Sequence, residues 1–297
     1  MERILGFIIR DEEAGQRADQ ILNRRFAMSR AMRKRIRQNP QGLMVNGQPF
    51  FMSARLAAGD RVELMLETAE AHSSNILPQN GRVDIVYEDE DLLVLEKSAG
   101  IPTEPGAGPV ADSLAGRVIG HYQRQGDNVV FRAVNRLDRG TSGLLVVAKN
   151  AWIHESLQQQ MISGRFVREY RAIVAVQPYP ESGLIAAPIR RKPGSILERE
   201  VHPEGATAKT FYSCLCYRGE FTLLGISTES GRTHQIRVHL ASIGCPLVGD
   251  FLYGQEQPEW MDRPALHASG LSFIHPLSGQ GLEFSSKLPQ DFQRLLQ

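Results

Sequence analysis

The stretch Ala133–Asn150, AVNRLDRGTSGLLVVAKN, joins a charged loop to an apolar run. It places one acid, Asp138, between Arg136 and Arg139, and the chain then enters the run Gly143–Ala148. A short continuous run rich in β-branched residues predicts a strand buried on both faces. An isolated charged loop is most often a solvated turn whose ion pairs contribute little. A polar loop leading into a buried strand instead holds its side chains at the edge of a rigid core, where catalytic groups are common.

The composition is that of a globular protein. The chain has 297 residues, of which 42% are hydrophobic and 23% charged, and this length suggests about two domains. No stretch has the roughly 20 apolar residues needed to cross a bilayer, and the first residues lack the pattern of a signal or transit peptide. We therefore expect a cytoplasmic protein with no membrane partner. Three cysteines without paired Cys-x-x-Cys units indicate neither a disulfide framework nor a zinc site.

The net charge is only +1, but the basic residues are unevenly distributed. Residues 24–38, RRFAMSRAMRKRIRQ, contain seven basic residues and no acid. Ser29 is suited to cap a helix that starts within this stretch. On that helix four cations recur at i, i+3, i+4 and i+7 and form one face, the basic stripe: Arg30, Arg33, Lys34 and Arg37. Such a stripe fits a phosphate backbone and predicts RNA binding, although a solvated face has the same spacing.

The residues after this helix predict a small sheet. Asn46-Gly47 stands between apolar residues, which is a strong hairpin signal. Two basic helices followed by a short hairpin sheet resemble the α-L motif, a small RNA-binding module named for a ribosomal small-subunit protein, over about residues 15–67. The polar, turn-rich stretch 67–82 predicts a linker. We therefore expect a small α+β RNA-binding domain at 1–72, a linker at 73–80 and a second domain at 81–297.

The second domain contains many short strand patterns and few helices. The stretch 151–164, AWIHESLQQQMISG, has apolar residues at i, i+4 and i+8 and ends at a glycine, as a surface helix does. The stretch 233–244, THQIRVHLASIG, fits a helix capped at Thr233 and closed by Gly244. Scattered helices among many strands predict a mixed α+β sheet rather than a regular βαβ alternation.

Five motifs of this second domain occur together in a recognisable order. The motifs are VYEDEDLLVLEKSAGIPTEPG, NRLDRGTSGLLVVAK, REYRAIV, SGRTHQIRVHLASIGCPLVGDFLYG and RPALHASGLSFIHP. Together they resemble an RluA-type pseudouridine synthase over about residues 81–285, which implies a catalytic domain with a mixed, mostly antiparallel sheet. Many members of that family also carry an N-terminal module similar to the α-L motif.

The resemblance implies that Asp138 is the catalytic aspartate, that Tyr170 is the active-site tyrosine and that Arg237 pairs with the aspartate. Isomerising uridine to pseudouridine adds and removes no atoms or electrons, so we expect no cofactor and no metal. An ionised carboxylate can act as base or nucleophile at the sugar, and a nearby arginine would keep it charged. The tyrosine ring can stack on the base, and its hydroxyl can assist proton removal. A covalent adduct and proton abstraction both remain open.

The target base must leave the RNA stack to reach such a site. Arg136, beside the aspartate, is placed to fill the gap or grip the backbone. Other candidate RNA contacts are Thr141, Lys149, Arg232 and His234, and for the last three a structural role is equally expected. The family often has a histidine at the position of Asn135 and a histidine-containing turn where Glu104-Pro105 stands. These departures bear on which RNA site is modified rather than on the chemistry.

Two functional classes follow from these residues. The first is an RNA pseudouridine synthase acting on ribosomal RNA, with transfer RNA as the alternative substrate, and we expect it to be a monomer. The second is a catalytically idle RNA-binding or chaperone protein on the same fold. Other chemistries fit poorly, because Ser142 lacks a nucleophile-elbow spacing and because His234 and His239, five residues apart, do not share a face.

Overall fold

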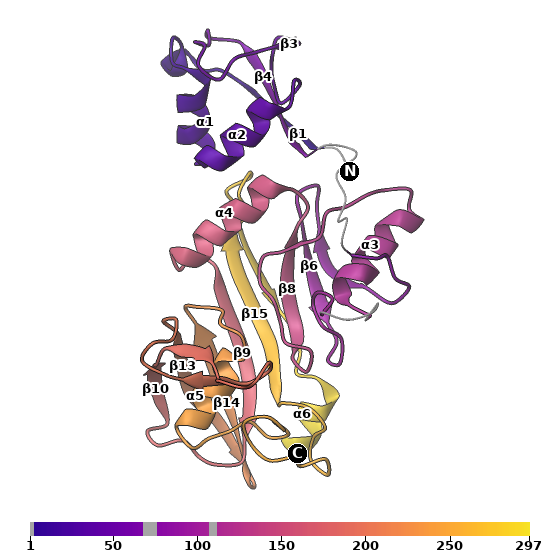
Figure 1. Cartoon of the computed structure of the whole chain (residues 1–297), viewed down its shortest axis with the longest axis vertical. Helices are drawn as coiled ribbons and strands as arrows, with labels where there is room; N and C mark the ends of the chain where they lie inside the picture. The colour runs from indigo at the N-terminus through magenta and orange to yellow at the C-terminus, as the bar shows by residue number, and fades with distance from the viewer. Residues whose placement is uncertain (1–2, 68–75, 107–111) are drawn as a thin grey trace.

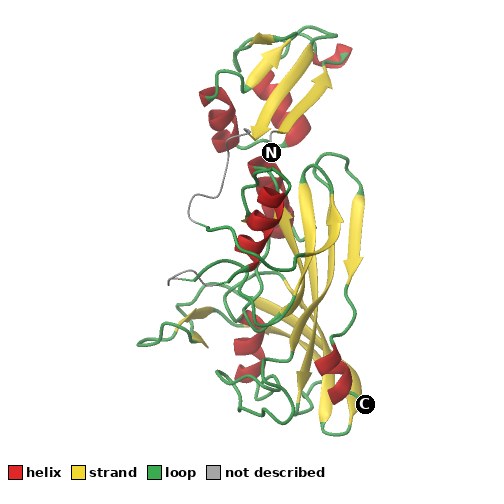
Figure 2. Ribbon diagram, turned by 90° about the vertical axis from the view of Figure 1, so that its right-hand side faces the viewer, coloured by secondary structure: helices red, strands yellow, loops and turns green. Residues whose placement is uncertain are grey.

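A computed structural model describes residues 3–67, 76–106 and 112–297 (Figure 1). The described residues form a small N-terminal unit and a larger unit built on one long sheet. The two units follow each other along the long axis of the molecule, as Figure 2 also shows. No helix among the described residues is long and apolar enough to span a membrane.

The N-terminal unit is a four-stranded antiparallel sheet with two helices. Its strand order is β1-β4-β2-β3. Its elements are β1 (Arg3–Ile8), a 3-10 turn (Asp11–Glu13), α1 (Ala18–Phe26), α2 (Arg30–Gln38), β2 (Leu43–Val45), β3 (Gln48–Pro49) and β4 (Arg61–Glu67).

Two local predictions for this unit are confirmed. Asn46 and Gly47 both have positive φ angles, 50° and 77°, as a two-residue hairpin turn of the primed kind requires. Ser29 caps α2, since its Oγ accepts a hydrogen bond from the Met32 amide at 3.0 Å.

The larger unit holds a ten-stranded, mixed sheet. Its main path is β10-β13-β14-β9-β15-β8-β6-β5, with β16 beside β15 and β7 beside β8. The strands are β5 (Asp84–Glu88), β6 (Leu92–Lys97), β7 (Arg132–Ala133), β8 (Ser142–Ala148), β9 (Val167–Val174), β10 (Ser182–Ala186), β13 (Lys209–Arg218), β14 (Phe221–Thr228), β15 (Leu266–Ile274) and β16 (Gly281–Ser285). All pairings are antiparallel except that of β15 with β8, which confirms the predicted fold class.

Within the described residues, four helices and a separate ribbon complete this unit. They are α3 (Leu114–Arg124), α4 (Ala151–Ile162), α5 (Gln235–Ser242), α6 (Gln290–Leu295) and the antiparallel pair β11 (Ile189–Arg191) and β12 (Arg199–Val201). Every residue of β8 is buried, as predicted. Leu145 and Val147 pack in the cluster that contains α3 and α5, and Val146 packs in the cluster that contains α4, so both faces of the strand are covered.

The two units are in contact through α4 (Figure 1). Trp152 on this helix is buried, its indole nitrogen donates to the Phe26 carbonyl at 3.1 Å, and the two rings meet edge to face at 5.9 Å. One hydrophobic cluster runs from the small sheet to α4 and β8. Buried Glu67 at the end of β4 forms ion pairs with Arg35 of α2, at 2.8 Å, and with Arg132 of β7, at 2.5 Å. Apolar packing and charge together join the units.

The predicted linker is described only in part. Its boundary at residues 72–73 lies outside the described residues. The described portion runs along α3, where the Gln79 amide donates to the Gly116 carbonyl at 2.9 Å. A Cβ on Gly120 would lie 2.2 Å from the Gln79 carbonyl oxygen, so this close approach requires glycine. The chain therefore enters the larger unit as a packed segment.

Candidate active site

A cleft of about 430 Å³ opens where the loop before β8 meets β9, the end of β14 and the start of α5. A volume of this size falls within the usual range for ligand sites, which is roughly 300–1,000 Å³. Seven of the predicted site residues line it: Arg136, Asp138, Thr141, Tyr170, Arg232, His234 and Arg237. The fold thus brings together residues that are up to about a hundred positions apart in the chain.

The loop that carries Asp138 is tied to the core on both sides. Asn135 is buried, and its Oδ1 accepts from the Val146 amide of β8 at 2.9 Å. The Thr103 hydroxyl donates to the Leu137 carbonyl at 2.8 Å and accepts from the Leu137 amide at 3.1 Å. Behind the acid, the amide of Thr141 donates to the Asp138 carbonyl at 3.0 Å. Asn135 therefore holds the loop against β8 through its side-chain carbonyl.

The carboxylate of Asp138 lies near two nitrogen atoms and remains accessible. Its Oδ2 is 3.8 Å from Nη1 of Arg237 and 4.0 Å from Nε2 of His234, and 28% of the side chain is exposed. These separations leave room for a substrate atom beside the carboxylate. Because catalytic contacts are often long in a protein without its substrate, the arrangement suits a reacting acid.

Arg237 is held chiefly by a second acid that the sequence analysis did not single out. Its Nε and Nη2 donate to the two carboxylate oxygens of Asp250 at 2.8 and 2.7 Å, and Asp250 is 0% exposed. Such a bidentate pair leaves Nη1 free to face Asp138. Burial alone would lower the pKa of Arg237, but the hydrogen bonds and charge of Asp250, with the charge of Asp138, raise it. Arg237 is therefore a fixed cation that lies between two acids. Its hydrogen bonds go to Asp250, and Asp138 is the more distant of the two.

A chain of hydrogen bonds sets the proton position on His234. The Arg199 amide and the Nδ1 atom of His234 each lie 2.8 Å from the Tyr253 hydroxyl oxygen. The amide must donate to this oxygen, and the carboxylate of Asp138, 4.0 Å from Nε2, favours an N–H on that nitrogen, so we assign the hydroxyl as the donor to Nδ1. Burial lowers the pKa of His234, and the charge of Asp138 opposes this only in part, so the ring is neutral near pH 7.

The backbone of His234 corrects a detail of the predicted helix. The cap of α5 is His234 in a left-handed conformation, with φ of 57°, rather than Thr233. A non-glycine residue in this conformation stores strain that its surroundings must offset. The contact with Tyr253 holds it in place, and the turn directs the imidazole into the cleft.

Tyr170 lies on β9, where its side chain faces the cleft and is almost fully buried. Burial raises the pKa of its hydroxyl, the charge of Arg168 lowers it and the charge of Asp138 raises it, with a net upward shift. The phenol is therefore protonated at neutral pH and presents an apolar ring with a polar tip, as required to stack on a base.

Comparison with known proteins identifies the family of this chain. Residues 91–242 match the family described as RNA pseudouridylate synthase. This chain belongs to that family. It is 38% identical to the uncharacterized RNA pseudouridine synthase YjbO of Bacillus subtilis (strain 168), over 86% of this chain and 89% of the relative. It is 34% identical to ribosomal large subunit pseudouridine synthase D of Escherichia coli (strain K12), over 97% and 92%. These similarities identify an enzyme of the RluA type.

A solved structure agrees on the fold. The human RNA pseudouridylate synthase domain containing 4 matches with a TM-score of 0.55 and 24% identity, over 71% of this chain and 92% of its own. At this level of identity the match concerns the fold alone. The mixed, mostly antiparallel sheet around β8 is thus the sheet of a pseudouridylate synthase domain.

Lys149 does not line the cleft. It is 6% exposed, and its Nζ pairs with Glu88 at 2.7 Å and also donates to the Asp89 carbonyl. Of its two expected roles, these contacts favour the structural one. Arg136 and Arg232 lie at the rim instead: 66% of the Arg136 side chain is exposed, and Arg232 is exposed.

The basic stripe lies on α2 of the N-terminal unit, outside the cleft. Arg30, Lys34 and Arg37 are exposed, whereas Arg33 is half-buried and donates to Asn23 and to the Met28 carbonyl. Among the residues that the structure describes, no carboxylate oxygen lies within 4.0 Å of these four cations. Their charge is therefore not neutralised within the described parts of the protein.

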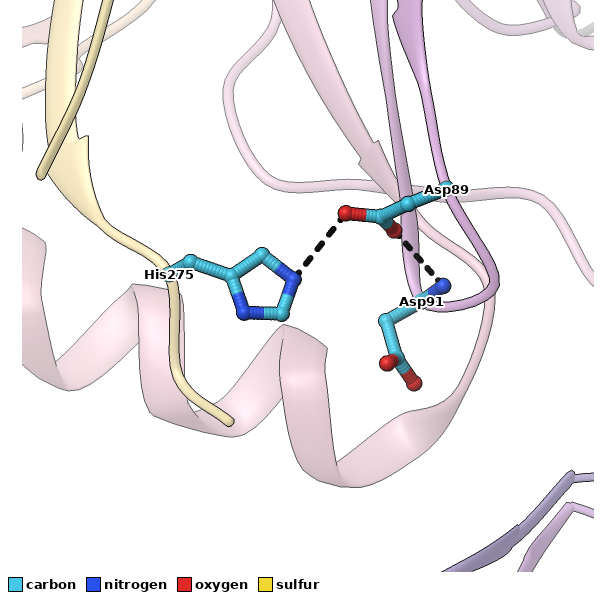
Figure 3. A group of neighbouring side chains, drawn as sticks. All are labelled: Asp89, Asp91 and His275. Atoms are coloured by element: carbon cyan, nitrogen blue, oxygen red, sulfur yellow. Dashed lines mark hydrogen bonds and ion pairs between the residues drawn. The ribbon is translucent and has the colours of Figure 1, made fainter. Parts of the chain in front are cut away.

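One group of side chains has the composition of a metal site: Asp89, Asp91 and His275 (Figure 3). The Nδ1 atom of His275 accepts the amides of Leu277 and Ser278 at 3.3 and 3.2 Å, so its proton sits on Nε2, 3.1 Å from Asp89. Neither ring nitrogen then has a lone pair to offer an ion.

The acids of this group are also engaged. Arg3 of β1 donates twice to the Asp91 carboxylate, at 2.9 Å each, and Asn150 donates to it at 3.0 Å. Burial would raise the pKa of Asp89, but the hydrogen bonds from His275, Tyr87 and two backbone amides outweigh it and lower the pKa. The donor set therefore suits a structural joint between the two units rather than a cation.

Proposed function

We propose that this enzyme isomerises uridines of ribosomal RNA to pseudouridine with Asp138 as the catalytic aspartate. The observation that carries this proposal is the accessible carboxylate in the cleft, placed between Arg237 and the N–H of His234 and near the buried ring of Tyr170. Ribosomal RNA is favoured over transfer RNA because a relative aligned over 97% of the chain is named a ribosomal large subunit pseudouridine synthase.

The chemistry requires a base to be detached, turned and rejoined. The bond from the ribose carbon to ring nitrogen one breaks, the uracil rotates, and ring carbon five bonds to the ribose. Ring carbon five then loses its proton, and ring nitrogen one gains one. Asp138 adds to the sugar or removes a sugar proton, and either role uses the ionised form that the nearby cation favours. Atoms and electrons balance within the nucleotide, so no cofactor enters the scheme.

The RNA is held by two parts of the protein in this proposal. At the cleft, the target nucleotide is flipped out, and exposed Arg136 at the rim fills the gap or grips the backbone. In the N-terminal domain, residues 1–72, the basic stripe contacts phosphates as an α-L module, followed by the linker at 73–80 and the catalytic domain at 81–297. A monomer acting in the cytoplasm completes the proposal.

The test is the substitution Asp138→Asn, which keeps the shape of the side chain but removes its ability to act as a base or nucleophile. Ribosomal RNA from cells lacking the protein is incubated with purified enzyme, and pseudouridine is mapped by carbodiimide modification and primer extension. We expect wild-type protein to modify defined uridines and Asp138→Asn to form no product while binding the RNA with similar affinity.

The control is Asp262→Asn, at an exposed acid outside the cleft, which should behave as wild type. Near-normal product formation by Asp138→Asn would contradict the role of the aspartate. RNA binding without any product from the wild-type protein would instead indicate the idle RNA-binding class.

A further inference from the structure

Arg168 is a buried cation of the cleft that the chemistry described so far does not use. It lies on β9 two residues before Tyr170, and side chains two apart on a strand share a face. Both residues line the cleft, and Arg168 is only 4% exposed. The sequence signal was present in the motif REYRAIV, where a charged residue occupies an inward position of a strand.

The guanidinium is fixed by backbone atoms. Its Nη2 donates to the carbonyls of Thr228 and Ser230 at 3.1 and 3.2 Å. The backbone at Gly231 passes close to the same group, because a Cβ there would lie 2.9 Å from Nη1. Arg168 thus has a defined position at the wall of the cleft, and Gly231 provides the space for it.

The charge of Arg168 has no acidic partner among the described residues. No carboxylate oxygen in those parts of the chain lies within 4.0 Å of it. Its Nε is buried and has no hydrogen-bond acceptor within the same described parts. Buried arginines are normally paired, and a buried donor without an acceptor costs free energy. Nη1 makes no hydrogen bond within the described residues and is not among their enclosed atoms, so it is the donor left for an acceptor that arrives with the substrate.

We propose that Arg168 binds a carbonyl oxygen of the flipped uracil and stabilises the negative charge of the detached base. The proposal rests on the proposed function. When the bond from ribose to ring nitrogen one breaks, its electron pair stays with the base, and the charge spreads over that nitrogen and the two carbonyl oxygens. Asp138 takes up the sugar carbon or its proton. When ring carbon five bonds to the sugar, Asp138 regains its electron pair or returns the proton to the sugar, and the base becomes neutral. Ring carbon five then loses its proton, and ring nitrogen one gains one.

The other cations of the cleft are less suited to this task. Arg237 directs two of its donors to Asp250, and Arg136 is exposed at the rim. A fixed charge shielded from water acts more strongly on a developing anion than a solvated one. A donor to the carbonyl at ring carbon four also rejects cytosine, which presents an amino group there, whereas a donor to the carbonyl at ring carbon two does not discriminate. Arg168 therefore favours cleavage with either carbonyl, and the choice of uracil only with the first.

The first test compares Arg168→Met and Arg168→Lys with wild type, on a short RNA that contains a uridine mapped by carbodiimide modification. At saturating RNA we expect Arg168→Met to lower the single-turnover rate about 10²-fold, the usual effect of removing one donor to a developing anion. The dissociation constant of the RNA should change less than about threefold, because this donor acts mainly on the transition state. Arg168→Lys keeps the charge and should recover part of the rate.

The matched control is Arg171→Met, on the same strand. Arg171 is half-buried, donates to the Tyr170 carbonyl and lies outside the cleft. Thermal unfolding of each variant shows whether the fold is retained. A wild-type rate for Arg168→Met, or losses of rate and of RNA affinity in equal measure, would overturn the proposal.

A second test places 2-thiouridine or 4-thiouridine at the target position, because sulfur is a weaker acceptor than oxygen. We expect one analogue to slow the wild-type enzyme and to have less effect on Arg168→Met, since that variant has no guanidinium to donate to the base. If Arg168→Met does not fold, Arg168→Lys takes its place in this comparison. Equal sensitivity of all proteins to both analogues would contradict the proposed hydrogen bond. No product from wild-type protein on unsubstituted RNA would contradict the proposed function itself, and the role of Arg168 with it.

Discussion

The basic stripe of α2 and the buried arginines of the cleft use the same kind of charge in opposite ways. Arg30, Lys34 and Arg37 are exposed and have no acid within 4.0 Å among the described residues, whereas Arg168 and Arg237 are almost completely buried. Exposed cations bind phosphates by releasing counterions, so their effects add and weaken with salt. Buried cations act through fixed geometry and are little screened. The two regions should therefore respond to different measurements, one to salt and the other to single-turnover kinetics.

For the buried arginines of the cleft, the largest effect is expected from Arg237→Met. The substitution leaves buried Asp250 without its cation and with only two backbone amides as donors, which should cost about 3–5 kcal/mol in the free energy of unfolding. It also removes the cation beside Asp138. We expect both stability, measured by urea denaturation, and pseudouridine formation to fall steeply. The double variant Arg237→Met/Asp250→Leu should recover most of the stability but none of the activity. Recovery of activity in the double variant would mean that Arg237 serves only to neutralise Asp250.

A more moderate effect is expected from replacing the basic stripe. Changing Arg30, Arg33, Lys34 and Arg37 to Gln should weaken RNA binding at low salt and reduce the slope of log affinity against log salt by about 0.7–0.9 for each phosphate that is no longer neutralised. The single-turnover rate at saturating RNA should not change. Binding is measured by fluorescence anisotropy between about 50 and 200 mM salt, the range over which such electrostatic binding weakens strongly.

The control for the stripe is Arg61→Gln, an exposed cation on β4 that already pairs with Glu63. Substitution is preferable to deletion of residues 1–72, because deletion would expose Trp152 and leave Arg132 without Glu67. An unchanged salt slope for the fourfold variant would show that the stripe is a solvated face.

The smallest effect is expected from Tyr253→Phe, which removes only the hydroxyl that fixes the proton on His234. The rate should fall by about tenfold or less, while long-range ¹H–¹⁵N NMR should show His234 losing its single Nε2–H tautomer. Because burial lowers the pKa of His234 below its ordinary value, the ring becomes protonated only at acid pH. The wild-type rate should therefore show no inflection from this residue above about pH 6.5. A pure Nε2–H tautomer in the variant would contradict the hydrogen-bond chain.

Local structure was largely predictable because it depends on neighbours in the chain. Asn46-Gly47 forms its turn because both residues tolerate positive φ, and Ser29 starts α2 because its hydroxyl reaches the Met32 amide. The apolar run Gly143–Ala148 is a buried strand, as its pattern indicated. The cap of α5 at His234 was missed, because the left-handed turn there is stabilised by Tyr253, a contact between residues 19 positions apart.

The sequence by itself determined the family, the mixed α+β fold and the motifs that meet in the cleft, because each is written in short runs of residues. Only the tertiary structure decided how the charges are divided. In the folded protein Lys149 is buried in an ion pair with Glu88, and Arg237 pairs with Asp250. Arg168 has no acid within 4.0 Å among the described residues. A charge acquires its role from burial and from the partners that distant strands bring within a few ångströms, and no run of neighbouring residues contains that information.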